Sequence, residues 1–195
     1  MTYTTNKTNT TYKRLIPPHG GYRTLKSYQT TTLIYDLTVE FCKTYMTYKT
    51  NTSYRTVDQM VQAARSGRQN IAEGSQASGT SKKTEIKLVG VARASLEELL
   101  TDYEDFLRQR SFPLWEKEDP RARSLRALAY KSNTTYTTYK TYLSDPEQAA
   151  NCLLTLIHQA NYLLDRQLQA LEKAFLENGG FTENLFKARL AERNK

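Results

Sequence analysis

A pair of glycines followed by hydroxyl and lysine side chains is the first feature of this sequence that could do chemistry. Gly74 and Gly79 are separated by four residues, and the stretch 80–83 reads Thr-Ser-Lys-Lys. A nucleotide-hydrolysing phosphate loop follows a strand and carries a lysine directly after its second glycine. Here helical periodicity precedes the glycines, and Thr80 occupies the lysine position. Nucleotide hydrolysis is therefore not expected, but the stretch could still bind an anion.

The two lysines of this stretch lie where a helix usually carries acidic residues. A helix is predicted to begin near Ser81, so its first backbone N–H groups face the loop. Lys82 and Lys83 then oppose the helix macrodipole, which costs about a few tenths of a kcal/mol per charge. A bound phosphate would reverse the sign of that effect. Two interpretations stay open: a solvated basic turn, or a contact with phosphate or a nucleic-acid backbone.

Charge is distributed unevenly along the chain, which has 195 residues and a net charge of +8. Residues 55–95 carry seven basic and three acidic residues, whereas residues 96–120 carry eight acidic and three basic ones. An excess of positive charge favours partners that carry phosphate or an acidic surface. If the helices around the glycine pair form a hairpin, its loop end is basic and its other end acidic. Nucleic-acid backbone contacts are therefore assigned to Arg65, Arg68, Lys82, Lys83, Lys87 and Arg93.

The remaining side chains offer little for catalysis or metal binding. Cys42 and Cys152 lie far apart and form no Cys-x-x-Cys pair, which argues against a zinc site or a disulfide framework and favours a reducing compartment. His19 and His158 are the only histidines, so a histidine-rich metal site is excluded. The acidic run 102–105 could suggest acid–base chemistry, but a solvated helix face explains it. We expect no enzyme, no catalytic residue, no metal and no cofactor.

Three tracts consist almost entirely of Thr, Tyr, Asn and Lys. They cover residues 1–13, 44–54 and 133–142. They lack the leucine and isoleucine of a helix face, so solvated loops are expected by analogy with other compositionally biased segments. Interleaved Tyr and Lys side chains could also stack on and neutralise single-stranded nucleic acid.

Outside these tracts the hydrophobic periodicity is helical. Apolar residues recur at spacings of three and four, and no alternating strand pattern lies between the helical segments. Four long amphipathic helices predict an all-α fold, an up-down four-helix bundle with extra short helices and low-complexity Thr/Tyr/Asn/Lys loops. The long helices are expected at about 24–44, 56–73, 81–110 and 145–177, and the short ones at about 121–131 and 183–193.

Several residues mark helix ends or close helix contacts. Ser144 and Glu147 have the spacing of a capping box, and the glycine pair 179–180 marks the end of the helix that follows. Thr182 is expected to cap the terminal short helix. A small residue at Gly67 suggests that its helix approaches a neighbour closely.

The last long helix carries a second apolar row beside its main one. The row consists of Ala149, Leu156, Leu163 and Ala170. A helix in a simple bundle buries one stripe, so the second row needs either the terminal short helix or another subunit to cover it. Both alternatives stay open. Leu156 and Leu163 are the expected oligomer-interface residues, because leaving each exposed would forgo about 1.5–3 kcal/mol of burial.

These segments predict three parts of the chain. Residues 1–21 form a low-complexity tail, residues 22–178 form the bundle with inserted loops at 44–54 and 133–142, and residues 179–195 form a C-terminal short helix. No apolar run approaches the roughly 18 residues of a membrane helix, and the N-terminus lacks the apolar core of a secretion signal. A cytoplasmic protein is expected.

Three short motifs, in this order, resemble those of a known family. They are NIAEG at 70–74, SKK at 81–83 and ARASLEEL at 92–99. They are similar to the four-helix-bundle proteins encoded in intervening sequences of bacterial 23S ribosomal RNA genes. The resemblance covers about 22–110, and the rest is similar to a C-terminal suffix found on some members.

A related branch of that family is the accessory protein of diversity-generating retroelements. It forms a pentameric barrel, and its basic surface engages nucleic acid and a reverse transcriptase. The resemblance implies a non-enzymatic, basic, oligomeric binding protein, with a pentamer favoured, and it brings no catalytic residues. Two functions are expected: an adaptor that binds RNA or DNA, or a protein-interaction scaffold whose partner is a reverse transcriptase or another subunit. The tract 44–54 replaces a loop that is usually short in the family.

Overall fold

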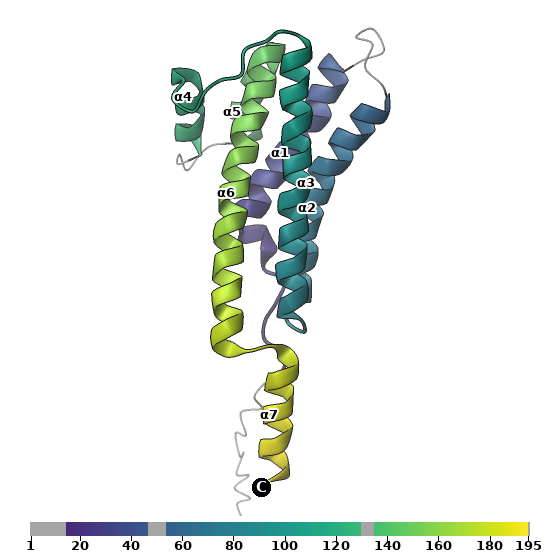
Figure 1. Cartoon of the computed structure of the whole chain (residues 1–195), viewed down its shortest axis with the longest axis vertical. Helices are drawn as coiled ribbons and strands as arrows, with labels where there is room; N and C mark the ends of the chain where they lie inside the picture. Colours follow the sequence, from purple (N-terminus) through teal and green to yellow (C-terminus); the bar gives the residue numbers. More distant parts are fainter. Residues whose placement is uncertain (1–14, 47–53, 130–134, 195) are drawn as a thin grey trace, which may run out of the picture.

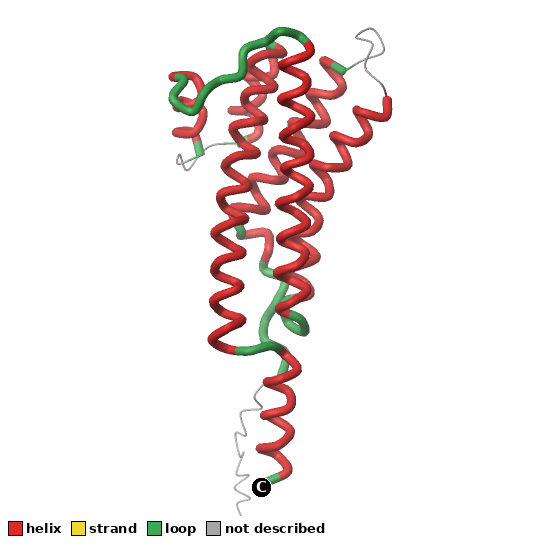
Figure 2. The backbone as a smooth tube through the Cα atoms, viewed as in Figure 1, coloured by secondary structure: helices red, strands yellow, loops and turns green. Residues whose placement is uncertain are grey.

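The computed structural model describes residues 15–46, 54–129 and 135–194. These residues form helices and short connections, with no strand among them (Figure 2). The all-α prediction is therefore confirmed. In chain order the elements are η1 (Tyr22–Thr24), α1 (Lys26–Tyr45), α2 (Tyr54–Ala77), α3 (Lys82–Gln109), α4 (Pro120–Leu128), α5 (Tyr136–Lys140), η3 (Thr141–Ser144), α6 (Pro146–Asn178) and α7 (Phe181–Arg193).

The four long helices lie along the long axis of the molecule and enclose its core (Figure 1). α1 packs against α2 and α6, and α3 also packs against α2 and α6. The apolar rows predicted from the sequence face inward, because burying them removes the largest apolar area from water. Each long helix contributes side chains that are fully buried; examples are Leu37, Ile71, Leu96 and Leu153.

Two predicted helix caps are wrong by a few residues, although the helices themselves are present. Asp145, rather than Ser144, caps α6: its carboxylate accepts a hydrogen bond from the Gln148 N–H at 2.9 Å. At the start of α7 the N-cap is Gly180, rather than Thr182. The end of α6 is as predicted, since Gly179 has a φ of 69° and donates its N–H to Phe175 O.

The tract 133–142 is helical over most of its described part, so the prediction of a loop there is wrong. Tyr139 of α5 is only 3% exposed, and Lys140 forms an ion pair with Glu40 of α1 at 3.6 Å. Tyr45 donates its hydroxyl to Leu143 O at 2.6 Å. Tyrosine rings supply here the apolar surface that leucine supplies elsewhere. The tract 1–13 and residues 47–53 of the second tract lie outside the described residues.

The second apolar row of α6 is covered mainly within the chain. Ala149 and Leu156 are 0% and 1% exposed, Leu163 is half-buried and Ala170 is exposed. α4 and η3, which belong to the connection between α3 and α6, pack against α6. Leu156 is buried within the chain, so its predicted place at an oligomer interface is wrong, whereas the place of Leu163 there stays a prediction.

The terminal helix does not cover that row either. α7 extends past the end of the bundle (Figure 1), and none of its described residues is buried. The hypothesis that it folds back over α6 is wrong for this structure. Among the residues that the structure describes, no helix has both the length and the apolar character to cross a membrane.

Candidate nucleic-acid interface

The two glycines Gly74 and Gly79 belong to close packing between segments rather than to an open loop. Gly74 lies inside α2 and is buried; a Cβ there would meet Glu85 O of α3 at 3.3 Å. Gly79 lies in the short turn between α2 and α3. A Cβ on Gly79 would come within 2.8 Å of the His19 ring and 3.1 Å of Ile16, so the N-terminal segment covers this turn. The turn is therefore not shaped as a phosphate cradle.

The start of α3 has its own capping groups. The Ser81 hydroxyl accepts a hydrogen bond from the Thr84 N–H at 3.2 Å. Lys82 lies 2.9 Å from the carboxylate of Glu85, one turn further along, and Glu85 is only 8% exposed. This pair places a negative charge near the helix N-terminus and balances Lys82. Lys82 is therefore already paired within the chain.

Arg93 is also paired, in a cluster that joins α3 to α6. Its Nε lies 2.6 Å from Asp165 Oδ1, and its guanidinium lies 3.6 Å from Glu97. The hydrogen bond to Asp165 raises the pKa of Arg93 above its ordinary value. Asn161 donates a further hydrogen bond to Glu97 at 3.1 Å. Arg93 thus holds two helices together, which no local pattern in the sequence could reveal.

Arg68 lies on the opposite side of the α2–α3 hairpin. Its guanidinium stacks over the ring of Tyr35 on α1 at 4.3 Å from the ring centroid. Its Nε is buried without a hydrogen-bond partner in the described part of the chain. Because Arg68 faces α1 whereas Arg93 faces α6, the structure does not bring these two predicted contacts together.

The other three predicted contacts are exposed cations. Arg65 of α2 and Lys83 and Lys87 of α3 form no ion pair with any described residue. Lys83 and Lys87 are four residues apart and therefore neighbours on one helix surface. These three side chains are free to contact an anion, but the structure does not bring them together: Arg65 adjoins Ser66, whose hydroxyl lies 2.9 Å from that of Ser95, well along α3 from Lys83 and Lys87.

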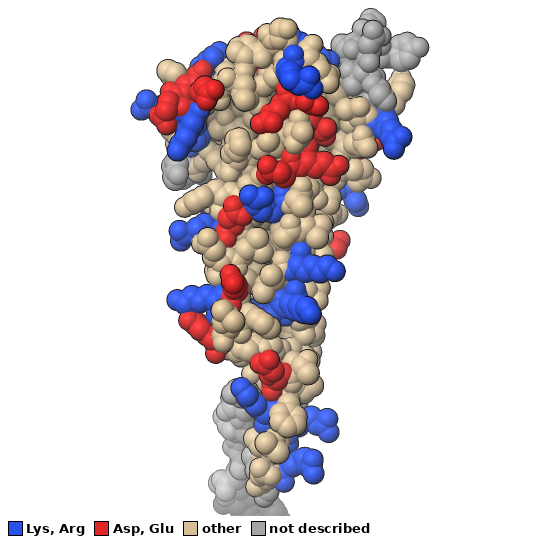
Figure 3. Space-filling model, in the orientation of Figure 1, with Lys and Arg blue, Asp and Glu red and all other residues tan. Residues whose placement is uncertain are grey.

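Charge changes sign along α3. Its first half carries lysines and Arg93, and its second half carries five carboxylates between Glu97 and Asp105. Figure 3 shows acidic side chains gathered over the upper part of this face. Burial, together with Glu98 and Asp105, raises the pKa of Asp102. The sequence-based prediction of a hairpin that is basic toward its loop and acidic toward its other end is thus visible in the fold.

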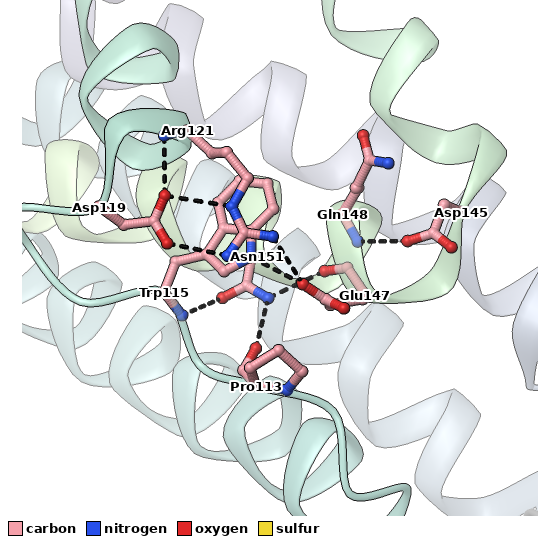
Figure 4. Close-up of polar contacts among 8 residues, drawn as sticks. All are labelled: Pro113, Trp115, Asp119, Arg121, Asp145, Glu147, Gln148 and Asn151. Atoms are coloured by element: carbon pink, nitrogen blue, oxygen red, sulfur yellow. Dashed lines mark hydrogen bonds and ion pairs between the residues drawn. The ribbon is translucent and has the colours of Figure 1, made fainter.

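A polar cluster that sequence reasoning missed fixes the connection after α3 onto α6 (Figure 4). The Trp115 N–H donates to Asn151 Oδ1 at 2.8 Å, and Asn151 Nδ2 donates to Pro113 O at 3.0 Å. The Trp115 indole N–H donates to Glu147 at 2.9 Å. In the sequence, only the single tryptophan of the chain, Trp115, could have drawn attention to this cluster. We call Pro113, Trp115, Asp119, Arg121, Glu147 and Asn151 the connection clasp.

Arg121 completes the connection clasp. Its guanidinium stacks 4.4 Å from the Trp115 ring centroid and pairs with Glu147 at 3.0 Å and Asp119 at 2.8 Å. The hydrogen bond from Arg121 lowers the pKa of Asp119. Because the charged groups bind one another, the cluster stabilises the connection between α3 and α6.

Neither cysteine is suited to reactive chemistry in the folded chain. Burial raises the pKa of both Cys42 and Cys152 to about 12, and Asp102 adds to the effect at Cys42. A thiol with such a pKa stays protonated near neutral pH and is a poor nucleophile. Within the described ranges, no three His, Cys, Asp or Glu side chains come together as a metal site.

Comparison with known proteins relates part of the chain to a family. Residues 24–112 match the model of the family described as 23S rRNA-intervening sequence protein. This segment contains α1, α2 and α3, and therefore all six predicted contact residues. The resemblance to this family is thereby confirmed over residues 24–112, whereas the resemblance to its retroelement branch stays a prediction. No curated protein and no solved structure matches the chain.

Proposed function

We propose that this chain, whose residues 24–112 match the model of the 23S rRNA-intervening sequence protein family, is a non-enzymatic adaptor that binds the backbone of RNA or DNA. The observation that carries the proposal is the exposed, unpaired lysine pair near the turn of the α2–α3 hairpin, Lys83 and Lys87, with Arg65 as a further exposed cation along α2. A cation already held by a carboxylate gains little from a phosphate, whereas an unpaired one releases counterions on contact.

The charge change along α3 gives the proposed contact a direction. Phosphate is attracted to the half of the hairpin near Lys83 and Lys87 and repelled by the half that begins at Glu97. A nucleic-acid backbone is therefore expected near the turn that joins α2 to α3. We assign Lys82, Arg68 and Arg93 a structural part, since each already has a partner within the chain.

The finer architecture and the assembly belong to the same proposal. The mutual packing of α1, α2, α3 and α6 supports an up-down four-helix bundle. A homo-oligomer, with a pentamer favoured by the family resemblance alone, would repeat the exposed cations around an axis. Linked weak contacts then add to avidity. A cytoplasmic location remains part of the expectation.

A protein-interaction scaffold is the second candidate. Its support is the exposed apolar surface near the C-terminus, where Leu176 is 77% and Phe186 is 67% exposed. Large exposed apolar side chains favour contact with another protein, for example a reverse transcriptase. Recovery of protein partners after nuclease treatment would favour this function over nucleic-acid binding.

The test replaces the three free cations together, as R65Q/K83Q/K87Q. Anisotropy of labelled single-stranded RNA and duplex DNA is measured between low and moderate salt. The wild-type affinity should fall with salt, and for the duplex the triple variant should reduce the slope of log K against log salt by roughly 0.9 for each lost phosphate contact. A charge-matched control, K43Q/R123Q/R166Q, changes exposed cations elsewhere and should keep the slope. Absence of wild-type binding at low salt would end the proposal.

A further inference from the structure

α7 presents large apolar side chains without a partner in the described chain. The helix extends past the end of the bundle (Figure 1). Phe186 is 67% and Leu190 is 47% exposed, whereas Phe181 and Leu185 on another side of the helix are half-buried. Pairs of exposed apolar residues on a projecting helix are typical of an interaction surface.

The exposed apolar pair lies within a stripe whose two ends carry opposite charges. Glu183, Phe186, Leu190 and Arg193 follow one another at spacings of three, four and three, which places them on one side of the helix. We call these four residues the α7 stripe. Neither Glu183 nor Arg193 forms an ion pair with a described residue. One carboxylate oxygen of Glu183 accepts the Gly180 N–H at 3.2 Å.

This order of residues makes the stripe complementary to itself when one copy is reversed. In an antiparallel pair centred at the level of Ala188, Phe186 lies opposite Leu190 of the second copy, and Glu183 lies opposite Arg193 of the second copy. A parallel pair would instead place like charges opposite each other. We propose that α7 is a self-association helix, and that two copies of this chain pair through antiparallel α7 stripes.

The position of α7 leaves room for this contact. A helix of 13 residues is about 20 Å long, and the bundle lies beyond only one of its ends (Figure 1). An antiparallel pair therefore places the two bundles at opposite ends, where they do not overlap. The contact is isologous and buries both exposed apolar pairs at once. It is a two-fold contact outside the bundle, separate from the ring of the proposed function, and it needs no nucleic acid.

Charge reversal tests the pairing. E183R and R193E are prepared separately, and association is measured by sedimentation equilibrium without nucleic acid. Each variant alone carries like charges at both ends of the stripe, so its dimerisation should weaken at least about tenfold, or about 1.4 kcal/mol. A mixture of the two variants restores opposite charges at both positions. It should therefore associate within about threefold of the wild type.

Controls and a second measurement separate this result from damage to the helix. A191R and A191E add charge at an exposed position away from the α7 stripe and should leave association unchanged. Under mild oxidation, E183C mixed with R193C should form a mixed disulfide faster than either variant forms its own. The natural thiols do not compete, because Cys42 and Cys152 are 2% and 0% exposed.

A wild-type chain that stays monomeric at millimolar concentration overturns the proposal. A mixture that associates no better than its components overturns it too. Nucleic-acid affinity is measured on the same proteins: its absence would count against the adaptor function and not against the α7 pairing, which is assayed without nucleic acid.

Discussion

At the scale of single residues, burial in the core changes the pKa of two cysteine thiols. Cys42 and Cys152 have a pKa of about 12 in the folded chain, compared with an ordinary value of 9.0. Burial is the main cause at both positions, because a thiolate is poorly solvated in an apolar core. Folding therefore disfavours the charged form of each thiol, and this difference makes stability depend on pH.

The sign of that dependence gives the first prediction. Below about pH 9 both thiols are protonated in the folded and unfolded chains, so their contribution to stability is fully present. Between pH 9 and pH 12 the unfolded chain loses protons first, and stability falls. At pH 10 the free energy of unfolding should drop by roughly 1 kcal/mol per thiol.

Urea unfolding at pH 7 and pH 10 checks it, with C42A/C152A as the comparison. The cavity left by alanine acts equally at both pH values, so the double variant should show a smaller loss between them. Both thiols also help to raise the pKa of Tyr103, so their removal lowers that pKa and acts in the same direction. An identical loss in the two proteins would contradict the prediction.

Two glycines in helices give opposite predictions. A Cβ at Gly67 would lie 2.9 Å from Leu96 Cδ2, and Leu96 is 0% exposed and cannot move into solvent. Overpacking should outweigh the gain in helix propensity, so G67A should destabilise the chain by about 1 kcal/mol or more. Gly90 meets nothing within 4 Å, so G90A should stabilise by about 0.5–1 kcal/mol. Thermal unfolding compares the two, and a more stable G67A would refute the packing argument.

The sequence predicted some of these residue-scale features and could not have predicted others. The glycine at position 67 indicated a close contact between helices, and in the structure Leu96 of α3 makes that contact. The pairing of Arg93 with Asp165 joins residues that are 72 positions apart. Which cations are paired depends on tertiary contacts, so only part of the predicted contact set remained exposed.

At the scale of elements, periodicity predicted the long helices because each buries one continuous apolar row. It failed for the tract 133–142, where Tyr139 contributes a buried ring within a Thr-rich sequence. It predicted the short helix α4 in the connection after α3, but not that this connection folds onto α6 through Trp115 and Asn151. Tertiary contacts override local composition in both segments.

The connection clasp yields the next prediction. N151A removes the acceptor of the Trp115 N–H and the donor to Pro113 O, so two backbone groups lose their partners. Such groups cost about 1–3 kcal/mol when buried and unsatisfied. Hydrogen exchange should accelerate in α4 and in the connection, and stay unchanged in the α2–α3 hairpin. Q148A, an exposed neighbour on α6, is the matched control; equal exchange in both variants would count against the role of Asn151.

At the scale of the whole molecule, the change of charge runs along the α2–α3 hairpin, whereas the proposed self-association surface lies on α7, beyond the bundle. The exposed cations Lys83 and Lys87 lie near the turn between α2 and α3, and the carboxylates of α3 lie toward its far end. The sequence predicted this polarity because a hairpin of adjacent helices preserves the order of charges along the chain. It did not predict that α7 projects from the bundle, since the direction of a terminal helix depends on the few residues around Gly179.

Removing α7 separates folding from association and gives the last prediction. None of the described residues of α7 is buried, so a chain ending at Asn178 loses little of the apolar burial that stabilises the core. Its midpoint of thermal unfolding should stay within about 4 °C of the full-length value, which corresponds to about 1 kcal/mol or less. The same chain lacks the α7 stripe and should lose the pairwise association that charge reversal in α7 weakens. Circular dichroism and sedimentation equilibrium measure the two effects. A truncated chain that unfolds would show that α7 supports the bundle, and one that still dimerises would place the interface elsewhere.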